Sequence, residues 1–454
     1  MAAFTLEEIL EATNGEAKQI ELGSAFSDVS TDTRFIPEGG LFVALRGDRF
    51  DGHHFVQEAI LGGAKAVLVE EEVDSSIPCI IVKNTLKAYQ DLARFHRRRF
   101  SIPVVAVTGS SGKTTTKEMI GDVLSEQFVV LRTEKNFNNE IGLPKTLLQL
   151  TDEHQVCVVE MGMRGLGQIA ELAAIAEPTI GVVTNVGTSH MELLGSQEEI
   201  AKAKGELIAA LPKDAYAILN EDDPYVRAMN QLGEHRIVSY GIDHPSMVQA
   251  VQIKAKRDGQ KFTCLCYGRD FDIFLPMVGR HNVYDALAAI AVARVLGVDS
   301  TKMNRALSHF TGTPMRQELI DLGDIILVND AYNANPSSMK EAILAVGQLE
   351  GKRKVAFLGD MLELGEQSAS MHEEIGIVLG EEKYALLFAF GKEAEYIIKG
   401  AMSAGVSKAV LTSSHEEMAA LYERERMPGD IVLIKGSRGM RMEDTIPFLI
   451  NKKE

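Results

Sequence analysis

The feature that most constrains the fold of this chain is an alternation of short apolar segments with longer amphipathic ones, which begins at residue 104. In the middle third, the apolar runs predict strands at 104–107, 156–160 and 180–184, and the segments between them predict helices at 113–127, 167–176 and 197–211. The last third repeats the pattern, with strands near 325–328, 355–358, 386–390 and 431–434 and a helix at 338–349. Apolar strands separated by helices are typical of a parallel sheet covered on both faces. We therefore predict an α/β fold.

Two interruptions divide the chain into three predicted domains. Around residues 97–103 a helical stretch that carries Arg97-Arg98-Arg99 gives way to an apolar strand, and around 312–314 Gly-Thr-Pro interrupts a second helical stretch. The predicted domains are a small mixed α/β domain (1–100), a central domain with a parallel sheet (101–312) and a C-terminal Rossmann-like α/β domain (313–454). We expect the three arginines to form a solvated helix end and the 312–314 segment to act as a hinge.

The charge balance excludes some classes of function. Lys and Arg number 47 against 64 Asp and Glu, which gives a net charge of −17, and such a field repels nucleic-acid backbones. No apolar run reaches the ~18 residues that a membrane helix needs, and the first residues lack a signal-peptide pattern. The four cysteines show no metal-ligand spacing, and Cys264 and Cys266 lie in an alternating run that predicts a strand. We expect a cytoplasmic protein that neither binds nucleic acid nor inserts into a membrane.

A glycine-rich loop joins the strand at 104–107 to the helix that follows it. Such a loop turns backbone N–H groups inward beside a helix N-terminus, which is a binding site for phosphates. Lys113 is expected to reach the β- and γ-phosphates, and the Thr114 hydroxyl to hold Mg²⁺. The position five residues before Gly112 is Val107, so the loop is a shortened variant that departs from ordinary GTPases and kinases. The predicted phosphate-binding residues are Thr108, Gly109, Ser110, Ser111, Gly112, Lys113, Thr114 and Thr115.

Three more polar residues follow predicted strands or lie on a predicted helix. Glu160 ends one strand and His190 follows another, at the sheet edge where α/β proteins collect ligands, although either residue alone could be an ordinary solvated group. At 100° per residue, Lys204 shares the apolar face of its helix with Ile200 and Leu207, whereas Lys202 points away from it. Lys204 is therefore either a snorkelling or ion-paired lysine, or an amine kept neutral by burial and available for chemistry.

The motifs taken together resemble the Mur ligase family of peptidoglycan synthesis. The resemblance extends from Asp32 to about Glu443, and the forms are those of the branch that adds D-alanyl-D-alanine. No DNPR-like signature for a diamino acid is present, and Asp285 stands where asparagine is expected. The motifs, in chain order, are TGSSGKTTTKEM, EKNFNNEIGLP, VVEMG, TNVGTSHMELLGS with AKGE, GRHN, NDAYNANP, LGDMLELGE and KGSRGMRME.

The resemblance implies ATP and two Mg²⁺ ions as cofactors. It implies that Thr114 and Glu160 hold the first ion, and that His190 and a carbamylated Lys204 hold the second. Asn282, Arg316 and Asp330 are implied to bind the adenine, phosphate and ribose. The implied residues for the UDP-linked substrate are Asp32, Thr33, Arg34, Asp51, Gly52 and His53, with Asn136, Asn138 and Asn139 near the reacting groups. The weaker candidates for contact with the incoming dipeptide are Asn333, Asn335, Asp360 and Glu363.

The implied reaction activates a peptide carboxylate of UDP-N-acetylmuramoyl-tripeptide as an acyl phosphate, which the D-alanyl-D-alanine amine then attacks. The protein is expected to act as a monomer. Two alternatives remain open: another Mur-type ligase or a folylpolyglutamate or cyanophycin synthetase relative, and, more distantly, a P-loop GTPase switch. The GTPase signature NKxD has only a near match, at residues 451–454.

Overall fold

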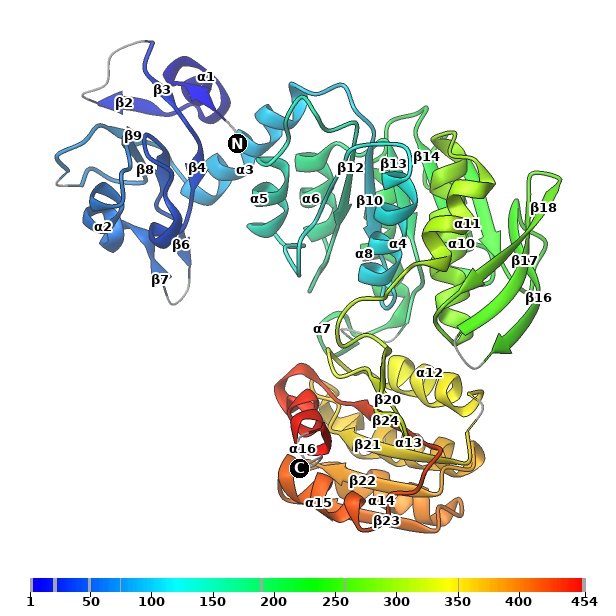
Figure 1. Ribbon diagram of the computed structural model, residues 1–454. Helices are drawn as coiled ribbons and strands as arrows, with labels where there is room; N and C mark the ends of the chain where they lie inside the picture. Colours follow the sequence, from blue (N-terminus) through cyan, green and yellow to red (C-terminus); the bar gives the residue numbers. More distant parts are fainter. Residues whose placement is uncertain are drawn as a thin grey trace.

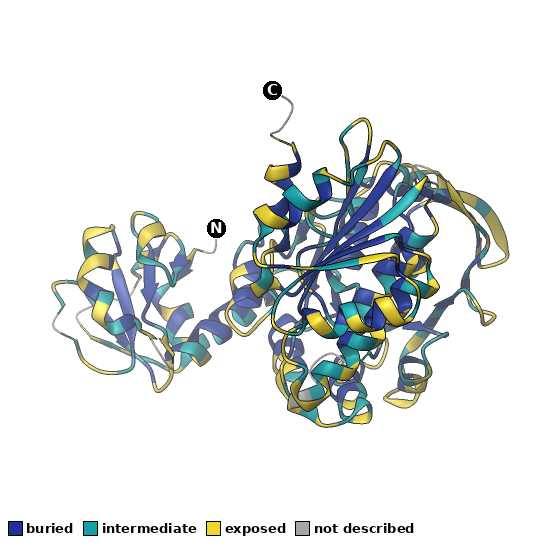
Figure 2. Ribbon diagram, turned by 90° about the horizontal axis from the view of Figure 1, so that it is seen from below, coloured by how far each residue is buried: buried dark blue, intermediate teal, exposed yellow. Residues whose placement is uncertain are grey.

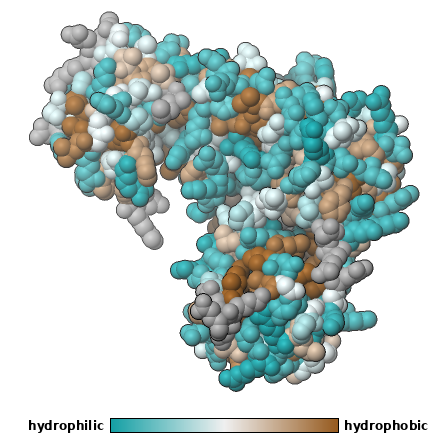
Figure 3. All heavy atoms as spheres, viewed as in Figure 1, coloured by the Kyte–Doolittle hydropathy of each residue, from teal (hydrophilic) through white to brown (hydrophobic). Residues whose placement is uncertain are grey.

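The computed structural model describes residues 3–18, 23–47, 50–73, 75–187, 191–256, 259–349 and 351–450. Three α/β domains follow one another along the chain, as predicted (Figure 1). In the space-filling view the N-terminal domain lies to the left of the central domain and the C-terminal domain below it, with an open hollow between the two outer domains (Figure 3). Within the described residues, no helix is both long and apolar enough to cross a membrane.

The N-terminal domain is built on a five-stranded sheet of order β2-β9-β8-β5-β4, whose strands are Glu16–Lys18, Cys79–Ile81, Ala66–Val69, Leu41–Val43 and Val29–Ser30. Two short antiparallel pairs accompany it: β1 (Phe4–Thr5) with β3 (Ala25–Phe26), and β6 (Arg46–Gly47) with β7 (Phe50–Asp51). Its helices are α1 (Leu6–Thr13) and α2 (Val56–Leu61). Helix α3 (Thr85–Arg98) leads to the central domain.

The expectation of a solvated arginine run at the end of α3 is wrong for Arg97. This side chain is buried, and its guanidinium donates hydrogen bonds to the carbonyl oxygens of Ala176 at 2.9 Å and Phe100 at 2.7 Å. The carbonyls at the end of α6 (Gln168–Ala176) need donors, and a guanidinium supplies several of them at once. Arg97 therefore ties α3 to the central domain, while Arg98 and Arg99 lie at the surface.

The central domain contains a nine-stranded sheet of order β11-β12-β10-β13-β14-β15-β16-β17-β18. The strands from β11 to β16 are parallel, as predicted, and β17 and β18 extend the sheet in antiparallel fashion. A hairpin connection needs no crossover helix, so this part lacks the alternation that predicted the rest. The strands, in chain order, are Val104–Thr108, Val130–Arg132, Val156–Glu160, Ile180–Val183, Tyr216–Asn220, Arg236–Gly241, Val248–Lys256, Gly259–Cys266 and Arg269–Leu275.

Helices cover both faces of the central sheet, and their apolar sides pack on its buried strands (Figure 2). One face carries α5 (Gly142–Leu147), α6 (Gln168–Ala176) and α8 (Gln197–Ala209), together with α3. The other face carries α4 (Lys113–Ser125), α10 (Arg280–Val295) and α11 (Ser300–Ser308). Two short helices, α7 (Met191–Leu194) and α9 (Pro224–Ala228), lie in connecting loops. The predicted helices of this domain are therefore confirmed.

The C-terminal domain has a six-stranded sheet of order β19-β20-β24-β21-β22-β23, parallel except for β19, with helices on both faces. The sequence did not predict β23, an edge strand that is only partly buried. The strands are Glu318–Asp321, Ile326–Asn329, Arg353–Gly359, Leu386–Phe390, Lys408–Thr412 and Asp430–Lys435, and the helices α12 to α16 are Pro336–Gly347, Ser368–Glu381, Ala394–Ser403, His415–Glu423 and Ile446–Ile450.

Candidate active site between the central and C-terminal domains

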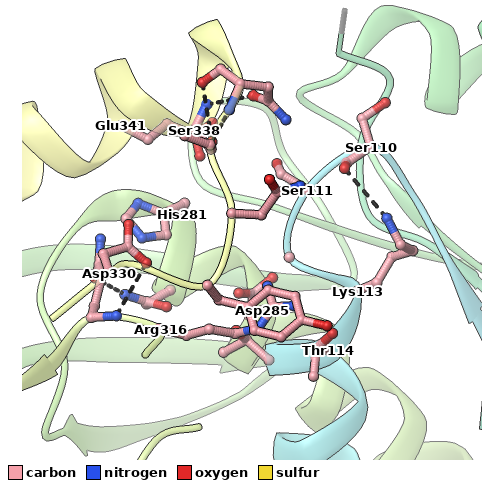
Figure 4. Close-up of a pocket in the computed structure, with 18 of the residues that line it drawn as sticks. Ser110, Ser111, Lys113, Thr114, His281, Asp285, Arg316, Asp330, Ser338 and Glu341 are labelled. Carbon is pink, nitrogen blue, oxygen red and sulfur yellow. Dashed lines mark hydrogen bonds between the residues drawn. The ribbon is translucent and has the colours of Figure 1, made fainter. Parts of the chain in front are cut away.

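A cavity of about 240 Å³ lies where the central and C-terminal domains meet. Figure 4 shows Ser338 and Glu341 of α12 on one side of it, opposite Ser110 and Ser111 of the glycine-rich loop. Both domains therefore contribute to one site. The predicted residues that line it are Ser110, Ser111, Gly112, Lys113, Thr114, Thr115, Asn138, Glu160, Asn282, Arg316, Asp330, Asn333 and Asn335.

The glycine-rich loop has the shape of a phosphate cradle. It follows β10 and opens α4 at Gly112, whose φ of 77° is a left-handed conformation that suits glycine. Asn185, at the end of the neighbouring strand, accepts a hydrogen bond from the Ser111 N–H at 2.9 Å and donates to the Ser111 carbonyl oxygen. A side chain at Gly109 would collide with Thr184, since an added Cβ would lie 1.8 Å from its hydroxyl oxygen. The loop is therefore held in place by the next strand of the sheet.

Two lysines, Lys113 and Lys204, lie near this loop. The Lys113 ammonium donates to the carbonyl oxygen of Gly109 at 2.8 Å, and burial, with a smaller effect of Arg316, lowers the pKa of Lys113. Lys204 on α8 is only 2% exposed. Burial, with Lys113 as a second cause, holds the pKa of Lys204 well below its ordinary value. Of the two interpretations that the sequence left open, the structure agrees with the buried lysine, and its carbamylation stays a prediction.

Glu160 ends β12 as a buried carboxylate with two oriented partners. The Thr114 hydroxyl donates to its Oε2 at 2.9 Å, and the Asn138 amide donates to its Oε1 at 2.8 Å. Hydroxyl and carboxylate oxygens are ligands that Mg²⁺ prefers. Among the described residues, no three His, Cys, Asp or Glu side chains cluster as a metal site. Thr114 and Glu160 fit the first predicted ion, while His190 lies outside the described residues.

The other asparagines of the Asn136–Asn139 loop differ in their surroundings. Asn136 is exposed, and Asn139 accepts a hydrogen bond from the Gly142 N–H at 2.9 Å, which fixes the start of α5. Of the three predicted asparagines, Asn138 is the one that lines the cavity and touches Glu160. The structure therefore places this loop beside the phosphate cradle.

The C-terminal domain contributes a set of charged residues. The Arg316 guanidinium stacks on the Tyr332 ring, 4.1 Å from its centroid. The Asp330 carboxylate pairs with the buried Lys435 ammonium at 2.6 Å and accepts a hydrogen bond from the Gln317 N–H at 3.2 Å. Lys435 also donates to the Asn333 carbonyl oxygen at 3.0 Å. Asp330 is therefore held rigidly at the edge of the cavity.

Asn282, the implied adenine-side residue, is buried on α10, and its amide donates to the Val278 carbonyl oxygen at 2.7 Å and to Gln317 at 2.8 Å.

Sequence reasoning assigned no role to several other residues of this site. Lys435 belongs to the KGSR motif and His281 to the GRHN motif, so both could have been singled out from the sequence. Neither motif indicates which partner the side chain contacts. The lining residues without a predicted role are Met277, His281, Asp285, Gln317, Tyr332, Ala334, Ser338, Glu341 and Lys435.

A second cavity, of about 580 Å³, adjoins the loop on the C-terminal domain's side. Asn333, Asn335 and Glu363 line it, together with Arg438. The fourth predicted acceptor residue, Asp360, lies elsewhere, because it is buried and its carboxylate accepts hydrogen bonds from the backbone N–H groups of residues 392 and 393. Those bonds fix the turn that follows β22.

A third cavity, of about 400 Å³, lies where the N-terminal and central domains meet, and Asp32 and Lys145 line it. Arg34 pairs with Asp32 at 2.7 Å and is the main reason that the pKa of Asp32 falls to about 2. Thr33 donates to a glutamate of α2 at 3.4 Å.

Asp51, Gly52 and His53 form a separate turn in the N-terminal domain. The Asp51 carboxylate lies 2.6 Å from His53 Nδ1, and the other ring nitrogen of His53 accepts a hydrogen bond from the Glu70 N–H at 2.9 Å. Because that nitrogen is an acceptor, the Nδ1 atom carries the proton and donates it to Asp51. Gly52 is buried. The structure thus divides the predicted substrate residues of this domain between two places.

Three family models match the chain in succession: "Mur ligase family, catalytic domain" over residues 26–106, "Mur ligase middle domain" over 107–293, and "Mur ligase, glutamate ligase domain" over 315–438. The UDP-N-acetylmuramoyl-tripeptide–D-alanyl-D-alanine ligase of Bacillus subtilis (strain 168) is 39% identical over 430 residues, which cover 93% of each chain. The protein of the same name from Escherichia coli (strain K12) is 34% identical and covers 99% of each chain.

Solved structures agree with this result. A crystal structure of MurF from Acinetobacter baumannii matches with a TM-score of 0.93 and 31% identity, over 99% of each chain. MurF ligase from Thermotoga maritima, in complex with ADP, matches with a TM-score of 0.85 and 31% identity, over 94% of this chain and 97% of that one.

The fold and the cradle are those of a P-loop enzyme, with the cradle in a cavity between two α/β domains. The chain belongs to the Mur ligase family, and it is an ATP-dependent ligase.

Proposed function

We propose that this protein joins D-alanyl-D-alanine to UDP-N-acetylmuramoyl-tripeptide, using ATP, to give the pentapeptide precursor of peptidoglycan, ADP and phosphate. The observation that carries the proposal is the shared cavity, in which the phosphate cradle of the central domain faces the Arg316 and Asp330 side chains of the C-terminal domain. The names of the relatives, which match over nearly the whole chain, support the choice of substrates.

In the proposed first step, the tripeptide carboxylate attacks the γ-phosphate of ATP and forms an acyl phosphate. Two anions must meet, so positive charge is needed around the transferring group. Lys113 would leave the Gly109 carbonyl and donate to the phosphates, and Arg316 would approach them from the other domain. Bound Mg²⁺ would neutralise phosphate charge, with Thr114 and Glu160 as the residues that hold one ion. The dipeptide amine then attacks the acyl carbon, and phosphate leaves.

Other residues would position ATP. Asp330, fixed by Lys435, has a carboxylate that can accept hydrogen bonds from the ribose hydroxyls, and Asn282 of α10, which lines the same cavity, would border the adenine. The acyl phosphate must be protected from water, so closure of the C-terminal domain (313–454) on the central domain (101–312) is expected, with the 312–314 segment as the hinge. Asn333, Asn335 and Glu363, which line the second cavity, are the proposed contacts of the dipeptide.

A second Mg²⁺ is assigned to His190 and a carbamate on Lys204. Carbamylation requires a neutral amine, and burial, which lowers the pKa of Lys204, favours that form. The support for this site is the burial of Lys204 beside the phosphate cradle.

The N-terminal domain (1–100) is the proposed binding site of the UDP moiety. Asp32 lines a cavity against the central domain, so the nucleotide of the substrate would lie at one end of the hollow and its peptide would extend towards Asn138. We place the protein in the cytoplasm, where UDP-linked precursors and ATP are available, and expect a monomer that does not bind nucleic acid.

The test is phosphate release from ATP with UDP-N-acetylmuramoyl-tripeptide, with and without D-alanyl-D-alanine, followed by mass spectrometry of the product. Tripeptides that end in diaminopimelate and in lysine are compared, which identifies the third residue that the enzyme accepts. Phosphate release that needs both substrates and yields the pentapeptide supports the proposal. Release that responds to a single amino acid or to glutamate, but not to the dipeptide, would show that the acceptor is wrong and the ligase class right.

A further inference from the structure

Asp285 is a carboxyl group in the nucleotide cavity for which the proposed reaction has no role. It lies on α10, is only 5% exposed, and lines the cavity next to the cradle. Its Oδ1 atom accepts a hydrogen bond from the Thr116 hydroxyl at 2.8 Å. A Cβ added at Gly112 would lie 2.5 Å from the same oxygen, so the carboxyl group packs directly against the last glycine of the loop. Figure 4 shows it between Arg316 and Thr114.

No cation pairs with this carboxyl group in the described part of the chain, and the Thr116 bond is the one hydrogen bond that it forms there. Burial, the largest effect, and the nearby Glu341 raise the pKa of Asp285 to about 8, while Thr116 and Arg316 act in the opposite direction. The titratable and charged side chains that line the same cavity or act on Asp285 come from α4, β12, β15, α10, residues 316–332, α12 and β24: Lys113, Glu160, Tyr240, His281, Arg316, Asp330, Tyr332, Glu341 and Lys435.

The geometry also says which oxygen can hold a proton. The Oδ1 atom is occupied as an acceptor, so Oδ2 is free to carry the hydrogen of the neutral acid. A neutral carboxyl group can lie against a phosphate-binding loop without repelling the phosphates. An ionised carboxylate adds a negative charge to a site that must also hold the negative charges of the nucleotide.

We infer that Asp285 acts as a protonated carboxyl group at the phosphate end of the nucleotide site, and that the enzyme binds its nucleotide tightly only in this neutral form. When the carboxyl group is ionised, binding of the nucleotide takes up one proton from solvent onto Oδ2. This inference rests on the proposed placement of the ATP phosphates in the cradle. It makes Asp285 a residue that couples nucleotide affinity to pH.

The test is calorimetric titration of the whole protein with ADP and Mg²⁺ at pH 7, 8 and 9, in pairs of buffers with different ionisation enthalpies, which counts the protons taken up. For wild type we expect uptake that rises towards one proton at pH 9, with a Kd about tenfold weaker at pH 9 than at pH 7. Asp285→Asn keeps the shape but cannot ionise, so it should lose this uptake and bind ADP at pH 9 as at pH 7. Protons from ADP itself and from the lysines contribute equally to both proteins.

Thr116→Val provides a second variant. The Thr116 hydroxyl lowers the pKa of Asp285, so its removal should move the loss of ADP affinity to higher pH, and this decides the question if Asp285→Asn does not fold. An unchanged midpoint in Thr116→Val, or the same proton uptake in wild type and Asp285→Asn, would overturn the inference and leave the proposed ligase function intact. Wild-type protein that binds no ADP would contradict both.

Discussion

Replacing Lys204 by methionine removes the charge of this side chain but keeps nearly all of its length. Lys204 is buried on α8, and its pKa in the folded protein lies well below its ordinary value. In the unfolded chain the amine titrates near the ordinary value of 10.5. Between these two pKa values the unfolded chain binds one more proton than the folded one, so the stability of the wild type rises with pH. The lysine therefore destabilises the folded state at every pH in that window.

The change in the free energy of unfolding is set by how far the pH lies below 10.5, down to the folded pKa of Lys204. Each unit below 10.5 contributes about 1.4 kcal/mol until the folded pKa is reached. Lys204→Met is expected to raise the free energy of unfolding by about 1.4 kcal/mol for each pH unit that separates the buffer from 10.5, down to the folded pKa of Lys204, with little change above pH 10.5. Lys202→Met is the matched control, because Lys202 lies on the same helix with its side chain 68% exposed. Its substitution should change stability by less than about 0.5 kcal/mol.

Urea unfolding in bicarbonate-free buffer, followed by circular dichroism, measures these differences. The chain contains no tryptophan whose fluorescence could report on one domain. Hydrogen exchange of peptides from β13 and α8 is therefore used to assign the transition to the central domain. In parallel, Lys204→Met should lower the ligase activity by more than about 100-fold. This loss exceeds the one that is typical when a residue that supports a metal ligand is changed. Removal of bicarbonate should lower wild-type activity reversibly and leave the residual activity of the variant unchanged. An equal pH dependence of stability in wild type and variant would refute the buried neutral amine, and a fully active variant would refute the carbamate.

Three other predictions concern single contacts. Glu160→Gln should keep the fold but raise the Mg²⁺ concentration needed for half-maximal activity by at least tenfold, as measured by phosphate release; an unchanged Mg²⁺ requirement would show that Glu160 does not hold the ion. Gly142→Ala should destabilise the protein by about 1–3 kcal/mol, because its Cβ would lie 2.4 Å from backbone atoms of the asparagine loop, whereas Gly165→Ala meets nothing within 4 Å and should be nearly neutral. Arg353→Met should lower the stability of the C-terminal domain by about 3–5 kcal/mol, because the buried Asp430 carboxylate loses its cation and keeps only the Tyr422 hydroxyl and the Met427 N–H as donors; a loss below 1 kcal/mol in thermal unfolding would contradict this.

Local patterns in the sequence were sufficient to predict the parts of the site that lie within one strand, loop or helix. The apolar run at 104–107, the glycines after it and the helix that begins at Lys113 are consecutive, so the phosphate cradle could be recognised without knowing what packs around it. The position of Lys204 on the apolar face of α8 followed from its angular spacing in the same way, but its burial did not. The strand that carries Glu160 was predicted with its correct ends.

Partners distant in the sequence could not be predicted, since a pattern of neighbours contains no information on which elements become adjacent. Arg97 appeared to end a solvated helix, yet it binds carbonyls nearly 80 residues away. The antiparallel strands β17 and β18 joined the central sheet without the alternation that marked its parallel part. The cavity and its charges follow the same rule: Asp330 meets Lys435 because β20 and β24 are neighbours in the sheet, and Asp285 meets Thr116 because α10 packs on α4. The sequence by itself determined the chemistry of the cradle, and the tertiary structure decided which charges face it, because burial and pairing are set by contacts between elements rather than within them.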